Sequence, residues 1–159
     1  MFMDKHPISV AGFAALQKRL RELKEVERPA ILAAVQRARD LGDLSENADY
    51  KTARDAQRQI DSEIRRIEGV ANNANVIDVS SLSGDRIMFG ALVVAEDGDG
   101  RQVRYKILAE CESDLSRNII AITSPLARAL VGKAAGDVCV VRTPAGEKEY
   151  KIISVSYGD

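Results

Sequence analysis

Four carboxylates recur at intervals of three residues within one short stretch of this sequence: Asp40, Asp43, Glu46 and Asp49. Carboxylates at such density repel one another unless water or a cation relieves the repulsion. Magnesium takes oxygen ligands, keeps several waters and is often held by only one or two carboxylates of a protein. Asp43 and Glu46 therefore form a weak magnesium site alone. In a partner that already holds one magnesium ion, they could help to bind a second ion about 4 Å away and complete a two-metal phosphoryl-transfer site.

The same stretch also has a purely structural interpretation. Asp43-Leu44-Ser45-Glu46 has the form of a capping box, in which Asp43 and Glu46 satisfy the first backbone amides of a following helix. The two interpretations are partly compatible, because a carboxylate that caps one amide keeps free lone pairs. Leu44, at the apex of the turn, is either an ordinary exposed leucine or an apolar wedge against a partner.

Basic side chains flank the acidic turn on both sides: Arg37, Arg39, Lys51 and Arg54. One interpretation is a small positive patch behind the turn, in which Arg39 and Arg54 contact phosphate. The other is a set of ion pairs with helix neighbours such as Asp40 and Asp55, each worth only tenths of a kcal/mol. The sequence supports both interpretations.

Two heptad patterns must position these side chains. Ser9 is a good N-cap, and after it apolar residues recur at spacings of three and four. Pro29 interrupts the first pattern, and a kink is expected there because proline removes a helix hydrogen bond. The expected seam residues are Phe13, Leu16, Leu20, Leu23, Ile31, Val35 and Ala38 before the turn, and Tyr50, Ala53, Gln57, Ile60, Ile64, Ile67 and Ala71 after it.

A short polar connection, residues 42–47, joins the two patterns. Short connections make neighbours, so the simplest arrangement is an antiparallel helical hairpin with the acidic turn at its far end. Each helix would be about 48 Å long if roughly 32 residues rise 1.5 Å apiece. Two helices folded back on a globular bundle would need a second apolar face, and each pattern has only one. The sequence predicts a protruding coiled-coil hairpin domain over residues 1–75.

A second domain is predicted over residues 76–159, where the heptads end and short β-branched stretches begin. Turn-forming residues at 97–100 and 144–146 predict two hairpins. Ser124 as N-cap and Pro125 at the first helical position begin one short helix. Strands are expected at 76–79, 86–96, 101–109, 118–123, 137–143 and 148–157. The fold class is therefore α+β, with an N-terminal α-helical hairpin and a C-terminal antiparallel β-sheet domain.

Composition excludes several function classes. With a formal net charge of -1, the chain has no bulk attraction for nucleic acid or anionic membrane, so any such contact must come from a local patch. No apolar run could span a bilayer, and residues 1–7 are too short and too charged for a signal peptide, so a cytoplasmic protein without membrane contact is expected. Cys111 and Cys139 stand apart from any His/Cys cluster, which predicts buried thiols rather than a zinc site.

Several motifs carry a resemblance to a known family. The turn segment 39–50 reads RDLGDLSENADY, residues 124–133 read SPLARALVGK, and Arg28-Pro29 lies upstream. VIDV at 76–79, FGA at 89–91 and TPAG at 143–146 fit the same pattern. Essentially end to end, the chain resembles the GreA/GreB family of bacterial transcript cleavage factors. Its near-neutral charge is similar to the GreA type rather than to the more basic GreB type.

The resemblance implies a factor that inserts its coiled coil through the secondary channel of bacterial RNA polymerase when the polymerase has backtracked. The polymerase would cut the nascent RNA near its extruded 3′ end, so this chain would not be an enzyme alone and would have no small-molecule substrate. Asp43 and Glu46 would hold a Mg²⁺ ion shared with the polymerase and position the attacking water, whereas the free protein would need no cofactor. Arg39 and Arg54 match the basic patch that faces the RNA.

The resemblance also implies an FKBP-like C-terminal domain, which docks at the rim of the channel through a loop that contains Ser124 and Pro125. Asp49 departs from the family pattern, in which Glu is common. Two other functions stay open. A secondary-channel inhibitor would use the same binding site with an altered tip, although here Asp43 and Glu46 are intact. A prolyl isomerase or holdase would need an aromatic-lined pocket, for which the second domain offers only Phe89, Tyr105, Tyr150 and Tyr157.

Overall fold

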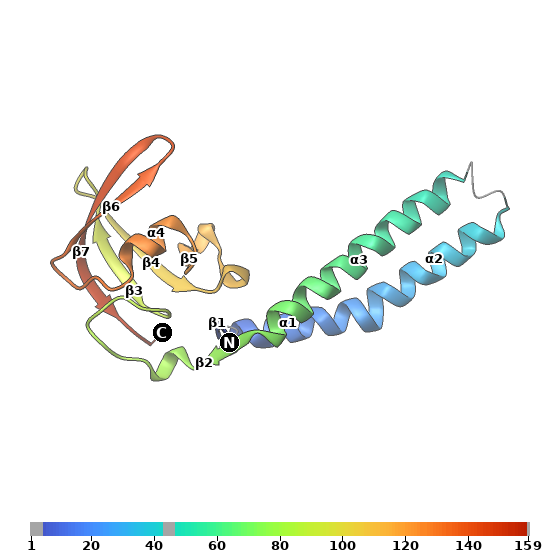
Figure 1. Ribbon diagram of the computed structural model, residues 1–159, viewed down its shortest axis with the longest axis horizontal. Coiled ribbons are helices and arrows are strands. Elements are labelled where there is room, and N and C mark those ends of the chain that lie inside the picture. Colours follow the sequence, from blue (N-terminus) through green and yellow to red (C-terminus); the bar gives the residue numbers. More distant parts are fainter. Residues whose placement is uncertain (1–4, 43–46, 159) are drawn as a thin grey trace. The chain divides into compact units, whose positions relative to one another are not determined.

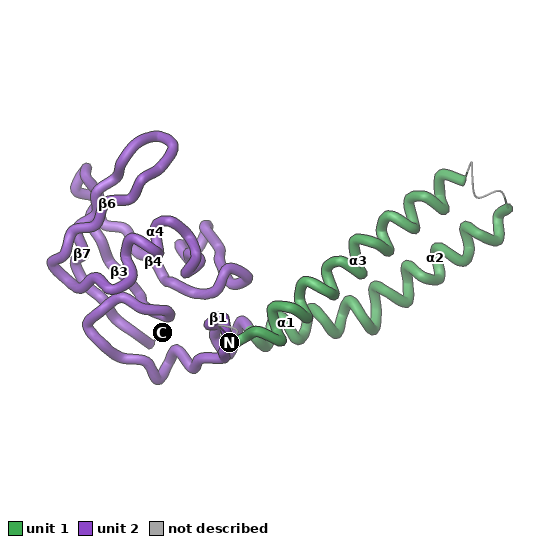
Figure 2. The backbone as a smooth tube through the Cα atoms, in the orientation of Figure 1, with its two compact units in different colours: residues 1–4, 13–74 green, residues 5–12, 75–159 purple. Residues whose placement is uncertain are grey.

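The chain forms two compact units. The computed structural model describes residues 5–42 and 47–158 (Figure 1). One unit contains residues 13–74, and the other combines residues 5–12 with residues 75–158 (Figure 2). The short N-terminal segment therefore belongs with the C-terminal residues. No helix in the described part of the chain is long and apolar enough to cross a membrane.

The first unit contains the predicted helical hairpin. α1 (Val10–Glu22), a π-helical segment (Leu23–Glu27) and α2 (Arg28–Asp40) follow one another, and α3 (Ala48–Asn72) returns alongside α2 (Figure 1). Near the turn the interface is made by small side chains such as Ala38 and Ala53, whereas leucine and isoleucine fill the part farther from the turn. All its buried apolar residues belong to the two heptad patterns: Leu16, Leu23, Val35, Ala38, Ala53, Ile64 and Ile67.

A π-helical turn shifts the register of the first heptad pattern by one residue. Continued from Leu23 at heptad spacing, the pattern would bury Arg37, but Ala38 is buried instead and Arg37 is exposed. The Arg28 amide donates to the Leu23 carbonyl five residues back, which adds one residue to the turn. The extra residue moves the apolar face forward by one position and keeps a charged side chain out of the interface.

Proline explains where this turn occurs. Pro29 lies in the first turn of α2. It has no amide to donate to the carbonyl four residues back, so regular α-helical hydrogen bonding cannot continue through this point. The interruption predicted at Pro29 therefore takes the form of a π-helical segment immediately upstream.

The second unit is built on a five-stranded sheet with the strand order β5-β4-β3-β7-β6. Its elements are β3 (Leu92–Glu96), β4 (Gln102–Leu108), β5 (Ile119–Ala121), α4 (Pro125–Leu130), β6 (Val138–Thr143) and β7 (Gly146–Ser156). β4 and β5 are parallel, and the other neighbouring strands are antiparallel. The α+β class is confirmed, with one parallel pair that the strand pattern did not predict. A separate two-stranded sheet joins β1 (His6–Ser9) to β2 (Ala74–Ile77).

Two strand predictions differ from the structure for local reasons. The strand expected at 86–96 begins only at Leu92, because the chain turns at Gly90, whose φ is +88°. A side chain at Gly90 would also collide, since an added Cβ would lie 2.9 Å from Leu82 Cδ1. Nothing in the sequence predicts the strand His6–Ser9, because four residues around a proline carry too little periodicity.

The core of the second unit packs α4 against the sheet. Its fully buried side chains include Ile87, Val93, Ile107, Leu130 and Ile152. Cys139 also belongs to this core, and burial raises the pKa of its thiol. Cys111, predicted to be buried, is exposed because it lies in the 3₁₀ turn Glu110–Glu112 at the surface.

The start of α1 is held within the second unit. Ser9 Oγ accepts a hydrogen bond from the Gly12 amide at 3.0 Å, which confirms Ser9 as the N-cap. The Glu112 carboxylate accepts from the Ser9 amide, the Ser9 hydroxyl and the Ala109 amide. An added Cβ on Gly12 would lie 2.3 Å from Glu112 Cδ, so only glycine leaves room for this carboxylate.

Candidate functional site

A single asparagine joins the two helices at the turn end of the hairpin. Asn47 is the N-cap of α3, and its Oδ1 accepts from the Tyr50 amide at 2.9 Å. Its Nδ2 donates to the Ala38 carbonyl in the last turn of α2 at 2.7 Å. One side chain thus satisfies an amide at the start of α3 and a carbonyl at the end of α2. These two hydrogen bonds therefore connect the end of α2 to the start of α3.

Asn47 also corrects the capping-box prediction. A box formed by Asp43 and Glu46 would start the helix at Leu44, whereas α3 starts at Ala48 with Asn47 as its cap. The N-cap of α3 is therefore Asn47 rather than Asp43. Asp43, Leu44 and Glu46 themselves lie outside the described residues, so the capping contacts of Asp43 and Glu46, the magnesium interpretation and the wedge role of Leu44 stay predictions.

Three arginines gather around Tyr50 in the first turn of α3. The guanidinium carbon of Arg39, in the last turn of α2, lies 5.8 Å from the centroid of the Tyr50 ring. Arg54 and Arg58 follow Tyr50 at one and two helical turns on the same face of α3. We refer to Arg39, Arg54 and Arg58 as the tip arginines.

Only one of the tip arginines forms an ion pair with a described carboxylate. Arg58 Nη1 lies 3.0 Å from Asp55 Oδ1. Arg54 Nη1 donates to the neutral Gln57 Oε1 at 2.7 Å, and Arg54 forms no ion pair with a described carboxylate. Arg39 rests on the Tyr50 ring, whose quadrupole attracts a cation without neutralising it. The group therefore carries a net positive charge among the described residues.

Of the two carboxylates expected in ion pairs with helix neighbours, Asp55 forms one and Asp40 forms none among the described residues. Asp40 accepts a hydrogen bond from Gln36 Nε2 at 3.0 Å rather than pairing with an arginine or lysine of the described ranges. Arg37 and Lys51 pair with no carboxylate in the described ranges 5–42 and 47–158. The phosphate contact of Arg39 and Arg54 stays a prediction.

The tip arginines lower the pKa of the Tyr50 phenol. A hydrogen bond with the Arg39 guanidinium is the main cause that lowers the pKa of the Tyr50 phenol from its ordinary value. The charges of Arg54 and Arg58 lower the pKa further, because a nearby cation stabilises the phenolate. Partial burial acts in the opposite direction and is outweighed.

A shallow groove of about 520 Å³ lies between α2 and α3 beside the turn. Alanines form much of its lining, and they leave space that larger side chains would fill. Its lining residues are Ile31, Ala34, Arg37, Ala38, Leu41, Asp49, Thr52, Ala53 and Ala56. Because apolar packing is thin here, this part of the hairpin depends more strongly on the hydrogen bonds of Asn47.

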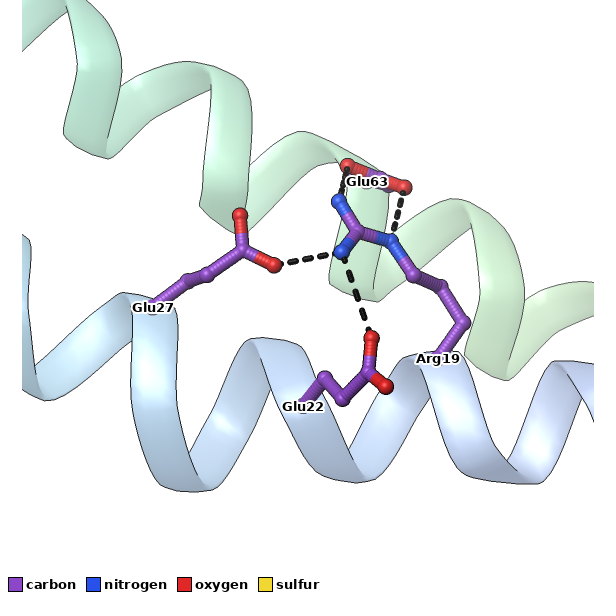
Figure 3. Close-up of polar contacts among 4 residues, drawn as sticks. All are labelled: Arg19, Glu22, Glu27 and Glu63. Atoms are coloured by element: carbon purple, nitrogen blue, oxygen red, sulfur yellow. Dashed lines mark hydrogen bonds and ion pairs between the residues drawn. The ribbon is translucent and has the colours of Figure 1, made fainter.

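Farther from the turn, Arg19 links three helical segments. Its Nε and Nη2 donate to the two carboxylate oxygens of Glu63 on α3, at 3.0 and 3.1 Å (Figure 3). Its Nη1 contacts Glu27 in the π-helical segment and lies 3.7 Å from Glu22 Oε2. The Arg19 contact lowers the pKa of Glu63, and the Glu63 and Glu27 contacts raise the pKa of Arg19. We call these four residues the Arg19 cluster.

Two further ion pairs cross between the same helices. Lys24 lies 3.6 Å from Glu68, and Arg28 lies 3.2 Å from Asp61. In the shaft of the hairpin, the part farther from the turn that contains the Arg19 cluster, Arg19, Lys24 and Arg28 therefore have carboxylate partners on the opposite helix. The turn end of the hairpin is the candidate functional site because the tip arginines gather there around Tyr50, next in sequence to Asp43 and Glu46.

Ser124 and Pro125 begin α4 as predicted. Ser124 Oγ accepts from the Ala127 amide at 3.2 Å, and Pro125 occupies the first turn. The ring of Pro125 is exposed beside the cap. The helix-start interpretation of this loop is confirmed, and its role in docking stays a prediction.

The aromatic side chains of the second unit serve its own packing. Phe89 and Tyr150 are buried, and Tyr105 packs edge-on against Tyr150 with ring centroids 6.5 Å apart. The Tyr157 hydroxyl accepts from the Met88 amide at 2.9 Å. An isomerase site needs aromatic rings that face a substrate, so this arrangement does not favour that alternative.

Sequence reasoning missed two residues of the candidate site. Asn47 is a preferred N-cap type directly before α3, but the more familiar box pattern at Asp43 obscured it. Tyr50 was expected in the helix interface, and it is only half-buried. The spacing of Tyr50, Arg54 and Arg58, one helical turn apart, is the signal that could have identified the cluster.

Comparison with known proteins assigns the chain to a family. The model described as "Transcription elongation factor, N-terminal" matches residues 6–76, and the model "Transcription elongation factor, GreA/GreB, C-term" matches residues 82–157. The chain belongs to the GreA/GreB family of transcription elongation factors. The resemblance in the turn and in the C-terminal motifs is thereby confirmed, and the family matches cover both units.

Relatives in the GreA/GreB family align over almost the whole chain. Transcription elongation factor GreA of Anaeromyxobacter sp. (strain K) is 47% identical over 156 residues, which cover 98% of this chain and 94% of that protein. GreA of Ruegeria pomeroyi is also 47% identical, over 98% of this chain and 99% of that protein. Among solved structures, GreA factor homolog 1 of Thermus thermophilus is 22% identical with a TM-score of 0.46, over 95% of this chain and 98% of that one.

Proposed function

We propose that this member of the GreA/GreB family stimulates cleavage of the nascent RNA in backtracked complexes of bacterial RNA polymerase. The hairpin enters the secondary channel and brings its acidic turn to the RNA 3′ end. The polymerase carries out the hydrolysis, so the chain is not an enzyme alone and takes no small-molecule substrate. Elongation then resumes from the new 3′ hydroxyl, in the cytoplasm where transcription takes place.

The observation that carries this proposal is the position of Asn47. Because Asn47 is the N-cap of α3, the Tyr50 amide is satisfied without Asp43 or Glu46. The hydrogen bond from Asn47 to Ala38 also connects the two helices that flank the turn. Carboxylates at the end of a hairpin whose N-cap is a separate residue suit a site that is completed by a partner.

Asp43 and Glu46 are the proposed ligands of a Mg²⁺ ion shared with the polymerase. Carboxylate oxygens match the ligand preference of Mg²⁺, and two of them leave most of its octahedral positions to water and to the partner. When bound, a second metal ion in such a site activates a water molecule and stabilises charge on the phosphodiester. The carboxylates of this chain would orient that water toward the RNA. No metal is proposed for the free protein.

The remaining site residues act on binding. Arg39 and Arg54 have no ion pair with a described carboxylate, so their guanidinium groups are available for RNA phosphates. Ser124 and Pro125 are proposed to contact the rim of the channel, since the exposed proline ring lies beside the helix cap. Leu44 is proposed as an apolar contact at the apex of the turn.

A transcript cleavage assay tests the proposal. Backtracked complexes with end-labelled RNA and Mg²⁺ are mixed with the wild-type chain, Asp43→Asn, Glu46→Gln or the control Asp40→Asn. Asp40 belongs to the same acidic series but contacts Gln36. We expect Asp43→Asn and Glu46→Gln to lower the cleavage rate by more than about tenfold, because metal contacts supply several kcal/mol of transition-state stabilisation. Asp40→Asn should keep most of the activity.

Two results would overturn the proposal. Full cleavage activity in Asp43→Asn would remove the metal role. A wild-type chain that slows nucleotide addition on active complexes without stimulating cleavage would instead be a channel inhibitor. Competition with a labelled wild-type chain for the polymerase shows whether each variant still binds, which separates loss of chemistry from loss of binding.

A further inference from the structure

Arg39 and Tyr50 lie across from each other where the two helices of the hairpin end. Arg39 is in the last turn of α2 and Tyr50 in the first turn of α3, on opposite sides of the acidic turn in sequence. The Arg39 guanidinium carbon lies 5.8 Å from the centroid of the Tyr50 ring, within the range of a cation–π contact. Tyr50 is half-buried, so its ring offers a fixed surface to an otherwise exposed arginine.

This contact holds the guanidinium while leaving most of its five N–H donors available. A guanidinium that rests on an aromatic ring keeps its N–H groups, which point outward in its own plane. Those groups form bidentate hydrogen bonds with phosphate. The other tip arginines differ, because Arg58 donates to Asp55 and Arg54 donates to Gln57. Arg39 is the tip arginine whose described contact is with an aromatic side chain rather than with a carboxylate or an amide oxygen.

The backbone at both partners is tied by the same side chain. Asn47 Oδ1 accepts from the amide of Tyr50, and Asn47 Nδ2 donates to the carbonyl of Ala38, the residue before Arg39. The backbone segments that carry the ring and the guanidinium are therefore linked through two hydrogen bonds of one side chain. Such an arrangement reduces the conformational entropy that a long arginine side chain loses when it binds a phosphate.

We propose that Tyr50 is a positioning residue, which orients the Arg39 guanidinium toward a phosphate of the RNA in the cleavage reaction. This inference rests on the proposed function, which supplies the RNA substrate. Its geometry comes from the contacts of the free protein. It assigns the role to the whole Tyr50 side chain, whose ring and hydroxyl both lie near the guanidinium. The lowered pKa of the Tyr50 phenol agrees with a cation held beside its hydroxyl.

The first test measures the contact in the free protein. Tyrosines labelled with ¹³C at Cζ are titrated by NMR in the wild-type chain, in Arg39→Ala and in the control Arg37→Ala. The pKa of Tyr50 should rise in Arg39→Ala, because its largest lowering contact is lost, and should not change in Arg37→Ala. Tyr105 and Tyr157 serve as internal references, since burial raises the pKa of both. An unchanged pKa of Tyr50 in Arg39→Ala would overturn the proposal, whether or not the chain stimulates cleavage.

The second test is a double-mutant cycle in the cleavage assay at saturating factor. Tyr50→Leu should slow cleavage by roughly twofold to fivefold, the range expected for an exposed cation–π contact. In an Arg39→Ala background the same change should have no further effect. Tyr50→Phe, which keeps the ring but loses the hydroxyl, should slow cleavage less than Tyr50→Leu. If Tyr50→Leu slowed cleavage equally in both backgrounds, Tyr50 would have a structural role only and the proposal would fail.

The two tests separate this inference from the proposed function. If the wild-type chain stimulated no cleavage, the proposed function would fail, and the NMR titration would still report whether Tyr50 holds Arg39. Thermal unfolding of Tyr50→Leu measures how much of its effect on the cleavage rate comes from a loss of stability. A rate deficit that followed the change in unfolding temperature, rather than the Arg39 background, would also contradict the positioning role.

Discussion

Replacing Asn47 removes two hydrogen bonds from the turn end of the hairpin. Asn47→Ala removes the N-cap acceptor of the Tyr50 amide and the donor to the Ala38 carbonyl. Asn47→Ser keeps an oxygen that can cap α3 but cannot reach the carbonyl as a second donor. The pair of variants therefore separates the cap from the connection between the helices.

The expected magnitudes follow from the two contacts. Loss of an N-cap costs about 1 kcal/mol, and loss of a neutral hydrogen bond costs about 1 kcal/mol more. We therefore expect Asn47→Ala to lower the free energy of unfolding by about 2 kcal/mol and Asn47→Ser by about 1 kcal/mol. Apolar packing should not compensate for the lost hydrogen bonds of Asn47, because the neighbouring interface is made by alanines beside a groove.

Urea unfolding followed by circular dichroism at the helical band measures these changes. Asn72→Ala is a matched control, since Asn72 is an exposed residue at the opposite end of α3. Equal loss in Asn47→Ala and Asn47→Ser would refute the contribution of the cap. Wild-type stability in Asn47→Ser would refute the contribution of the hydrogen bond to Ala38.

Three further outcomes concern the shaft of the hairpin. Leu23→Ala should cost about 2–5 kcal/mol in urea unfolding, because the Leu23 side chain is 0% exposed and its removal leaves a cavity. Arg19→Met should be less stable than the wild type at neutral pH, and this difference should narrow as the pH falls. The reason is that Arg19 lowers the pKa of Glu63, so the stability from their pair is present above the ordinary pKa of a glutamate and is lost on acidification through the lowered one. Deletion of Val26 should be tolerated in thermal unfolding, because it removes the extra residue of the π-helical segment, whereas deletion of Ala33 should destabilise the hairpin by moving its seam out of register.

A specific result would contradict each of these three predictions. A Leu23→Ala variant with wild-type stability would mean that the π-helical segment packs differently. A constant difference between Arg19→Met and the wild type from neutral to acidic pH would remove the contribution of the ionised Glu63. Equal destabilisation by the two deletions would show that the register shift does not arise in the π-helical segment.

Periodicity predicted the hairpin because its interface is a repeating contact between two neighbouring helices. The heptad positions from Leu16 to Ile67 supply all of its buried apolar residues. The sequence also predicted that Val35 and Ala38 lie in the interface. It did not predict the π-helical turn that places them there. A one-residue shift can be absorbed by a kink, a π-helical turn or a bend, and these options differ in backbone hydrogen bonds rather than in residue types.

Contacts between distant residues were harder to predict. The parallel pairing of β4 with β5 depends on the path of the connection between them, which includes two short 3₁₀ turns. Cys111 lies in the first of these turns, so its exposure depends on the same path. At the candidate site, residue types suggested Arg39 and Arg54, whereas the role of Tyr50 depends on how two helix ends meet. Only tertiary structure brings that ring to the arginine.

The ion pairs between the two helices affect how strongly the hairpin adsorbs to polyanions. Arg28 and Lys24 already have carboxylate partners on the opposite helix, and so does Arg19. A cation that is neutralised within its own protein releases few counterions when it approaches a nucleic acid, so it contributes little to non-specific adsorption. Adsorption of the hairpin to polyanions should therefore depend little on Arg19, Lys24 and Arg28.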